Sequence, residues 1–250
     1  RRGGRGEGSE KGARQPEGAP PPEGEVFFSH FQAQNRDITV VAVEWFAGTL
    51  GLLGPELGKK KRGAPRKGLR VLEALAGTGV RAARVALEAR GVAHVTANDA
   101  NPAARDALLA TVERNGLEGI MEVSGRDAIQ LLEESVAGFD VVEIDPCGSP
   151  ASILPAAVRA VASPGLLCIN AFDLDQLEGH TPAGRARCAN RYGAYPSPGR
   201  CAGEAARRLL LGAVARRAAE AGRRIEPVLC AVLEYHVKLI VLVTDEDKDE

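Results

Sequence analysis

A carboxylate that directly follows an apolar run is the first residue of this sequence that could do chemistry. The run Phe139–Ile144 is typical of a short buried strand, and it ends in Asp145-Pro146-Cys147-Gly148. Proline holds the residue before it in an extended conformation, and glycine allows a sharp turn. The stretch therefore predicts a carboxylate at the carboxyl end of a strand, where open α/β sheets bind ligands. An isolated Asp-Pro pair is usually only a turn, so other signals must decide.

A glycine turn provides the second candidate site. Val71–Leu75 has the character of a strand, Ala76-Gly77-Thr78-Gly79 that of a tight turn, and Val80–Ala89 that of a helix. Such a turn lets a ligand approach the backbone beside the free N–H groups of a helix N-terminus. The strand-like run His94–Asn98 then ends at Asp99, about twenty residues further on, where such folds hold the hydroxyls of a ribose.

A third acidic position follows the strand-like run Ile120–Val123. Asp127 and Ala128 precede a predicted helix, Ile129–Glu134. Asp127 could receive an adenine amine, or it could cap that helix, and the two roles are compatible.

Two cofactor classes fit these positions. The segment Gly77–Ala82 satisfies the Gly-x-Gly-x-x-Ala pattern of a dinucleotide dehydrogenase. An S-adenosylmethionine (SAM) methyltransferase instead uses an acid on strand one, an acid ending strand two, an acid after strand three and a polar motif ending strand four. Those places hold Glu73, Asp99, Asp127 and Asp145-Pro146-Cys147-Gly148. The dehydrogenase interpretation leaves the last two unexplained, so the pattern favours SAM.

The alternation of strands and helices predicts an α/β fold: a doubly wound, mostly parallel, seven-stranded Rossmann-like sheet. Gly165–Ala171 is its expected fifth strand, and the β-rich runs Ile225–Val232 and His236–Val243 suggest a closing antiparallel hairpin. Glu204–Ala221 is an expected long helix. Thr181–Arg200 is expected to be irregular; its arginines and tyrosines suit single-stranded or flipped nucleotides, or form an ordinary polar loop.

The predicted domain spans residues 26–243, between a disordered arm at 1–25 and an acidic tail at 244–250. Asn35 or Asp37 is expected to cap a helix that continues to Trp45. The basic stretch Leu57–Arg70 is expected to be an exposed loop that is either a solvated linker or a phosphate contact.

The amino-acid composition limits the partners that the chain is expected to bind. The 250 residues carry a net charge of −1, so any nucleic-acid surface must be a local patch. The five cysteines form no Cys-x-x-Cys pair, so we expect no metal and a reduced, intracellular environment; a nuclear or mitochondrial location stays open. No apolar run approaches the length of a membrane span, so no membrane is expected, and the oligomeric state is unknown.

Taken together, these motifs resemble the tRNA (guanine(26)-N(2))-dimethyltransferase family. The segments that carry the resemblance are Val26-Phe27-Phe28, Asn35-Arg36-Asp37, Leu72–Ala82, Ala97-Asn98-Asp99, Asp127-Ala128 and Asp145–Pro150. Less sharp matches continue from Ala171-Phe172-Asp173 through Tyr192-Gly193 to Val228-Leu229. The resemblance covers most of residues 26–243, in the order of the family.

This resemblance implies a SAM-dependent enzyme that mono- and dimethylates the N2 amine of one tRNA guanine. The residues that would bind SAM are Arg36, Glu73, Gly77, Gly79, Arg81, Asp99, Asp127 and Ala128. Arg36 and Arg81 would face its methionine end. Asp145 and the carbonyl of Pro146 would face the guanine N2.

The chain departs from the family in two respects. The family has an aromatic residue after Asp-Pro, which would stack on a flipped guanine, and this chain has Cys147. The family also continues into a C-terminal RNA-binding domain, so we expect this sequence to be truncated.

Two alternatives to this function remain. RNA cytosine-C5 methyltransferases place a nucleophilic cysteine after proline near the end of strand four, as Pro146-Cys147 does. The usual residue between Asp and Pro is missing here, and no Thr-Cys pair occurs on strand five. The other alternative is an RNA-binding relative whose catalysis is impaired by Cys147.

Overall fold

The computed structural model describes residues 26–53 and 68–246. The predicted arm at 1–25, most of the basic stretch Leu57–Arg70, and residues 247–250 of the acidic tail lie outside these ranges.

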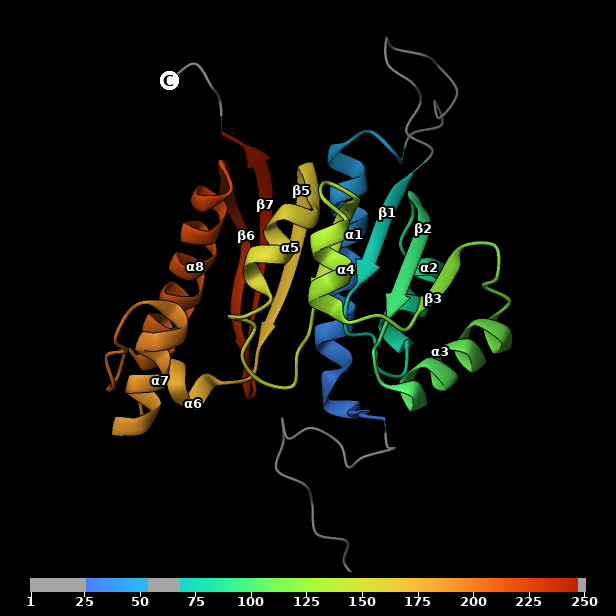
Figure 1. The fold of residues 1–250 in the computed structure, drawn as a ribbon. Helices are drawn as coiled ribbons and strands as arrows, with labels where there is room; N and C mark the ends of the chain where they lie inside the picture. The colour runs from blue at the N-terminus through green and yellow to red at the C-terminus, as the bar shows by residue number, and fades with distance from the viewer. Residues whose placement is uncertain (1–25, 54–67, 247–250) are drawn as a thin grey trace, which may run out of the picture.

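A seven-stranded sheet runs through the centre of the molecule in the order β3-β2-β1-β4-β5-β7-β6 (Figure 1). β7 is antiparallel to both of its neighbours, and the other pairs are parallel, so the predicted sheet and its closing hairpin are confirmed. The strands are β1 (Leu69–Glu73), β2 (Val92–Asn98), β3 (Met121–Ser124), β4 (Phe139–Ile144), β5 (Val161–Ala171), β6 (Arg223–Leu233) and β7 (His236–Asp245).

Helices pack on both faces of the sheet. The helices are η1 (His30–Gln32), α1 (Ala33–Thr49), α2 (Val80–Glu88), α3 (Pro102–Asn115), α4 (Ala128–Glu134), α5 (Leu154–Ala160), α6 (Leu174–Leu177), α7 (Pro182–Tyr192) and α8 (Ala202–Glu220). One apolar core lies between the sheet and α4, α5 and α8, and the other lies beneath α1, α2 and α3 (Figure 1). Because both faces are covered, the central strands consist largely of apolar residues, which made them recognisable in the sequence.

Local signals explain why several elements begin and end where they do. α3 starts at Pro102, where the Asn101 side chain accepts a hydrogen bond from the N–H of Ala103 at 3.0 Å. It ends at Gly116, whose φ of 61° is left-handed. β4 has the bounds that the sequence predicted, Phe139–Ile144.

The prediction that Thr181–Arg200 is irregular is wrong for the first half of this segment, because Pro182–Tyr192 forms α7. The Thr181 hydroxyl caps this helix by accepting from the N–H of Gly184 at 2.9 Å, and Gly193 ends it with a φ of 68°. These are ordinary helix start and stop signals.

Smaller expectations also need correction. α1 begins at Ala33 and runs to Thr49, so Asn35 and Asp37 lie within it instead of capping it. Thr244 and Asp245, expected in the tail, belong to β7, which pairs with β6 there. None of the helices in the described ranges is both long and apolar enough to cross a membrane.

Candidate active site

A cavity of about 300 Å³ lies at the carboxyl ends of β1 and β4. β1 and β4 are neighbours in the sheet, and the strand order reverses between them. Ligands bind at this topological switch point in open α/β sheets. The cavity is lined by eight of the predicted residues: Arg36, Glu73, Gly77, Arg81, Asp99, Asp145, Pro146 and Cys147.

Three predicted residues do not line this cavity. The carboxylate of Asp127 caps α4, accepting from the N–H of Gln130 at 2.9 Å, and Ala128 is buried in the first turn of that helix. Gly79 has a φ of 76°, and a side chain there would collide with Leu108 of α3. Gly79 is therefore needed for close helix packing, and the cofactor roles of these three residues stay predictions.

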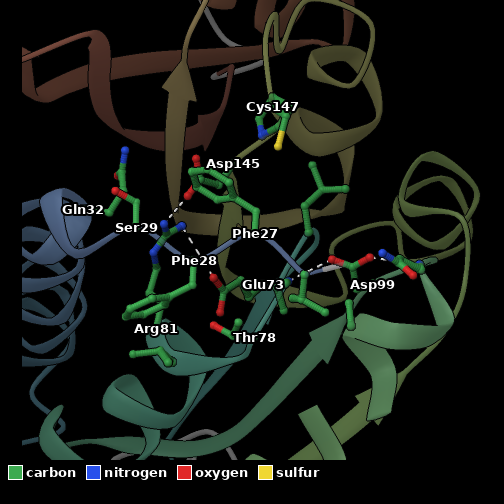
Figure 2. Close-up of a pocket in the computed structure, with 18 of the residues that line it drawn as sticks. Phe27, Phe28, Ser29, Gln32, Glu73, Thr78, Arg81, Asp99, Asp145 and Cys147 are labelled. Atoms are coloured by element: carbon green, nitrogen blue, oxygen red, sulfur yellow. Dashed lines mark hydrogen bonds and ion pairs between the residues drawn. The ribbon is translucent and has the colours of Figure 1, made fainter. Parts of the chain in front are cut away.

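Asp99 holds the glycine turn in place. Its Oδ2 accepts from the N–H of Gly77 at 2.8 Å, and its Oδ1 accepts from the N–H of Asn101 at 3.0 Å (Figure 2). A carboxylate oxygen can accept more than one hydrogen bond, so these contacts leave acceptor capacity for ribose hydroxyls.

Arg81 lies between the acidic groups of the site, not free at its rim. Figure 2 shows its guanidinium between Asp145 and Glu73. Nη2 pairs with Asp145 Oδ2, and Nη1 lies 3.1 Å from Glu143 Oε1 and 3.5 Å from Glu73 Oε1. Its side chain is only 8% exposed. The predicted contact of Arg81 with the methionine end of SAM stays a prediction. Arg36 is half-buried at the cavity and donates to the carbonyl of Ser29 at 3.1 Å.

Sequence reasoning missed the buried ion pair that lies next to this arginine. Glu143 of β4 and Lys238 of β7 are both buried, with Lys238 Nζ 2.7 Å from Glu143 Oε1. Thr39 donates to Glu143 Oε2 at 3.0 Å, and Asn170 donates to Oε1 at 2.8 Å. The available signal was a charged residue inside each of two apolar strands, because buried charges require partners.

The three acids Glu73, Glu143 and Asp145 surround only two cations, Arg81 and Lys238. The charges of this cluster therefore balance only if one acid is neutral. Burial raises the pKa of Glu73 to about 8, with Arg81 opposing the rise and Glu143 adding to it. For Glu143, the charges of Lys238 and Arg81 outweigh burial and hold its pKa below the usual value. We therefore assign the proton to Glu73, the buried acid whose pKa is raised.

The loop after β4 presents one unpaired acceptor. Asp145 Oδ1 is buried and has no hydrogen-bond partner among the described residues, whereas Oδ2 takes Arg81. The Pro146 carbonyl accepts from the N–H of Gly148 at 2.8 Å, and the Gly148 carbonyl accepts from the N–H of Phe172 at 2.9 Å. This loop can therefore hold a fixed carboxylate against an incoming N–H donor.

Cys147 lines the cavity without the features of a nucleophile. Desolvation of the sulfur, followed by the negative charges of Asp145 and Asp99, raises the pKa of the thiol. A nucleophilic cysteine needs the opposite surroundings, because the thiolate is the reactive form. This environment disfavours the cytosine-C5 alternative.

Sequence comparison places this geometry in a known family. The sequence model of the N2,N2-dimethylguanosine tRNA methyltransferases matches residues 14–249. The chain belongs to this family. It is 32% identical to the mouse tRNA (guanine(26)-N(2))-dimethyltransferase over 89% of this chain and 39% of that protein. It is 34% identical to the enzyme of the same name from Methanocaldococcus jannaschii, over 88% of this chain and 55% of that protein.

A solved structure has the same fold. The complex of Trm1 from Pyrococcus horikoshii with S-adenosyl-L-methionine superposes with a TM-score of 0.75 at 27% identity, over 88% of this chain and 57% of that one. The chain thus spans between about two fifths and three fifths of the length of the relatives compared here.

The residues of the cavity fit the ligand of that solved relative. SAM carries a sulfonium and an ammonium, and the cavity offers buried acidic oxygens without hydrogen-bond partners in the described ranges, Glu73 Oε2 and Asp145 Oδ1. It also offers Asp99 for hydroxyl groups, Arg36 for a carboxylate, and apolar walls such as Phe27 for a flat ring. In the described part of the chain, no cluster of His, Cys, Asp and Glu side chains is arranged to hold a metal ion.

Proposed function

We propose that this chain methylates the N2 amine of guanine 26 in tRNA, first once and then a second time, with SAM as the methyl donor. The names of its relatives and its family membership support this activity. The observation that carries it is Asp145, which lines the cavity: its Oδ2 is held by Arg81, while its buried Oδ1 lacks a hydrogen-bond partner in the described ranges.

The N2 amine of guanine is a poor nucleophile, and the chain must increase its reactivity. The N2 lone pair of guanine is delocalised into the ring, so an acceptor on its N–H groups raises the electron density on nitrogen and fixes its direction. Asp145 accepts one N–H bond, and the Pro146 carbonyl, which accepts only from Gly148 N within the described backbone, accepts the other. Orientation and electrostatic stabilisation of this kind are each worth several kcal/mol.

When bound, SAM supplies an electrophilic methyl group on a sulfonium. As the nitrogen–carbon bond forms, the carbon–sulfur bond breaks and its electron pair stays on sulfur. The N2 proton that becomes acidic passes to the Asp145 carboxylate and then to water. Arg81, held by Glu143 at 3.1 Å, keeps the carboxylate facing the amine throughout.

The second methylation needs only one of these two hydrogen bonds. A singly methylated amine keeps one N–H, which Asp145 can still accept. The small side chain of Cys147 at the cavity wall leaves room for the first methyl group. An intracellular location is also part of this proposal, and the free thiols of all five cysteines are compatible with it.

The test is nucleoside analysis of unmodified tRNA incubated with the chain and labelled SAM. We expect N2-methylguanosine followed by N2,N2-dimethylguanosine, and no product from a tRNA with adenine at position 26. Formation of 5-methylcytosine would support the cytosine-C5 alternative. SAM binding without transfer to any tRNA would support the catalytically impaired relative.

A further inference from the structure

Arg81 needs an anchor of its own if it is to hold Asp145 in one orientation. Its Nη2 pairs with Asp145 Oδ2, while Nη1 lies 3.1 Å from Glu143 Oε1 and 3.5 Å from Glu73 Oε1. An arginine side chain has several rotatable bonds, so a contact with Asp145 alone would leave the guanidinium free to move. The shorter of the two Nη1 contacts, the one with Glu143, is therefore the one that can fix it.

Glu143 is held by three other elements of the fold. Lys238 Nζ of β7 donates to Oε1 at 2.7 Å and to Oε2 at 3.0 Å. The Thr39 hydroxyl of α1 donates to Oε2 at 3.0 Å, and the Asn170 amide of β5 donates to Oε1 at 2.8 Å. A carboxylate bound from three directions has one orientation, so the Oε1 atom that contacts Arg81 is fixed in place.

Lys238 has no donor left for a ligand. Its side chain is 0% exposed, and Nζ donates to Thr39 Oγ1 at 3.0 Å as well as to both oxygens of Glu143. An ammonium has three donors, and these three contacts use all of them. Among the described residues, neither Lys238 nor Glu143 belongs to the lining of the cavity, whereas Arg81 does. An effect of the ion pair on the reaction must therefore pass through Arg81.

Stability alone is a poor explanation for this buried ion pair. Two charges taken out of water lose hydration that their mutual attraction only roughly restores, and well-packed apolar residues of similar volume stabilise a core as well or better. Two residues along β4 and β7, Val141 and Ile240 are buried in the same apolar core beneath α1. An apolar pair would therefore have sufficed here if the core only had to be filled.

We infer that Glu143 and Lys238 are positioning residues: their ion pair holds the Arg81 guanidinium on Asp145, so that the carboxylate keeps its direction towards the guanine N2. This inference rests on the proposed function, because it assumes that Asp145 accepts from the guanine amine. It adds to the reaction two buried residues outside the cavity lining, and through Thr39 it connects α1 to the reacting carboxylate.

The first test is Glu143→Gln, which keeps the shape of the side chain and removes its charge. Arg81 then loses its anchor, so kcat for methyl transfer should fall roughly 10- to 100-fold, while KM for tRNA and the Kd for SAM stay within about twofold. Asp140→Asn is the matched control. Asp140 is also a buried acid of β4, but it pairs with Arg70 at 3.6 Å, near the end of the strand that is remote from the cavity, so kcat should not change.

A double variant separates positioning from a structural role. Glu143→Gln alone leaves Lys238 buried without its counter-charge, whereas Glu143→Gln with Lys238→Met removes one charge of each sign. The double variant should unfold at about the same urea concentration as the parent and still show the loss of kcat. A purely structural pair would instead give a double variant that regains both stability and activity.

Parent-like kcat in the folded double variant would overturn the inference, as would an equal loss of kcat in Asp140→Asn or a SAM affinity that falls as far as kcat. If neither variant at position 143 folds, Thr39→Val replaces them; it removes only the hydroxyl that bonds both charged groups. Its kcat should fall several-fold, and an unchanged kcat would count against the inference.

A parent chain that methylates no guanine would contradict the proposed function instead. A crystal structure of the folded Glu143→Gln variant, single or double, then decides the inference without an activity assay. Arg81 should move away from Asp145 when its anchor is lost, and an Arg81 that keeps this contact would overturn the inference.

Discussion

At the scale of single residues, the site depends on a shared set of buried charges. Asp145, Glu73 and Glu143 all lie around the guanidinium of Arg81, and Lys238 supplies the second cation. Removing one member of such a cluster leaves its partner buried and uncompensated, which is costly. Conservative replacements are therefore the informative ones.

Glu73→Gln tests the proton that we assign to Glu73. The folded pKa is raised to about 8 from 4.5, so the stability supplied by this group is complete below pH 4.5 and is lost as pH rises through 8. We expect the parent chain to lose free energy of unfolding relative to Glu73→Gln between pH 6 and 9. Urea unfolding at both pH values measures this difference. A difference that does not change with pH would show that Glu73 is ionised throughout.

Asp99→Ala tests the predicted ribose contact. The change removes charge-assisted hydrogen bonds to the sugar and the two backbone bonds that hold the Gly77 turn. SAM binding should weaken by roughly 1–3 kcal/mol, as measured by calorimetry. NAD should give no signal with the parent chain, and tight NAD binding without SAM binding would contradict the cofactor assignment.

At the scale of elements, α7 holds the loop that follows β4 in place. The Tyr192 hydroxyl, at the end of α7, donates to Asp173 Oδ1 at 2.8 Å and lies 2.7 Å from Ser149 Oγ. Ser149 follows the Asp145–Gly148 turn, and Asp173 follows Phe172. This contact therefore joins the segments that follow β4 and β5.

Tyr192→Phe should reduce kcat for methyl transfer while leaving the Kd for SAM nearly unchanged. Removing the hydroxyl leaves the buried Asp173 with a weaker set of partners, so the free energy of unfolding should also fall by about 1–3 kcal/mol. Tyr195→Phe is the matched control because Tyr195 is 75% exposed. Equal behaviour of the two variants in both assays would rule out a fastening role for Tyr192.

The helices and strands show how much of the fold could be predicted from the sequence alone. The strand Phe139–Ile144, the Gly77 turn and the hairpin follow from local patterns, because turn chemistry and burial on both faces leave clear signatures. The helix at Pro182–Tyr192 was missed because its arginines resembled a polar loop, although Thr181, Pro182 and Gly193 marked its ends. Arg81 was placed correctly on the cavity, but its partner Glu143 could not be inferred, since that contact depends on strand pairing between β1 and β4.

At the scale of the whole molecule, the proposed binding of tRNA has to rely on local charge, because the net charge is −1. Arg185 and Arg191 are used internally, donating to the Gly179 carbonyl and to Gln176. Arg187 and Arg200 are exposed on the same segment. The lysines Lys59, Lys60 and Lys61 lie outside the described residues.

Replacing Arg187 and Arg200 together with Ala should make tRNA binding less sensitive to salt. If each contacts one phosphate, the slope of log Kd against log salt should fall by up to about two units. Arg90→Ala is the control, because Arg90, which follows α2, pairs with Glu44 of α1. A slope that stays the same in the double variant would show that these two arginines do not contact phosphate.

The most direct test of the central claim compares Asp145→Asn and Cys147→Ser in one methyl-transfer assay with nucleoside analysis. We expect the parent to produce N2,N2-dimethylguanosine, and Asp145→Asn to lose nearly all transfer while still binding SAM. The loss then belongs to kcat, because the carboxylate acts on the amine and not on the donor. Cys147→Ser should retain most of the activity. A parent that makes 5-methylcytosine, together with an inactive Cys147→Ser variant, would contradict guanine methylation, because the thiolate would then be the nucleophile.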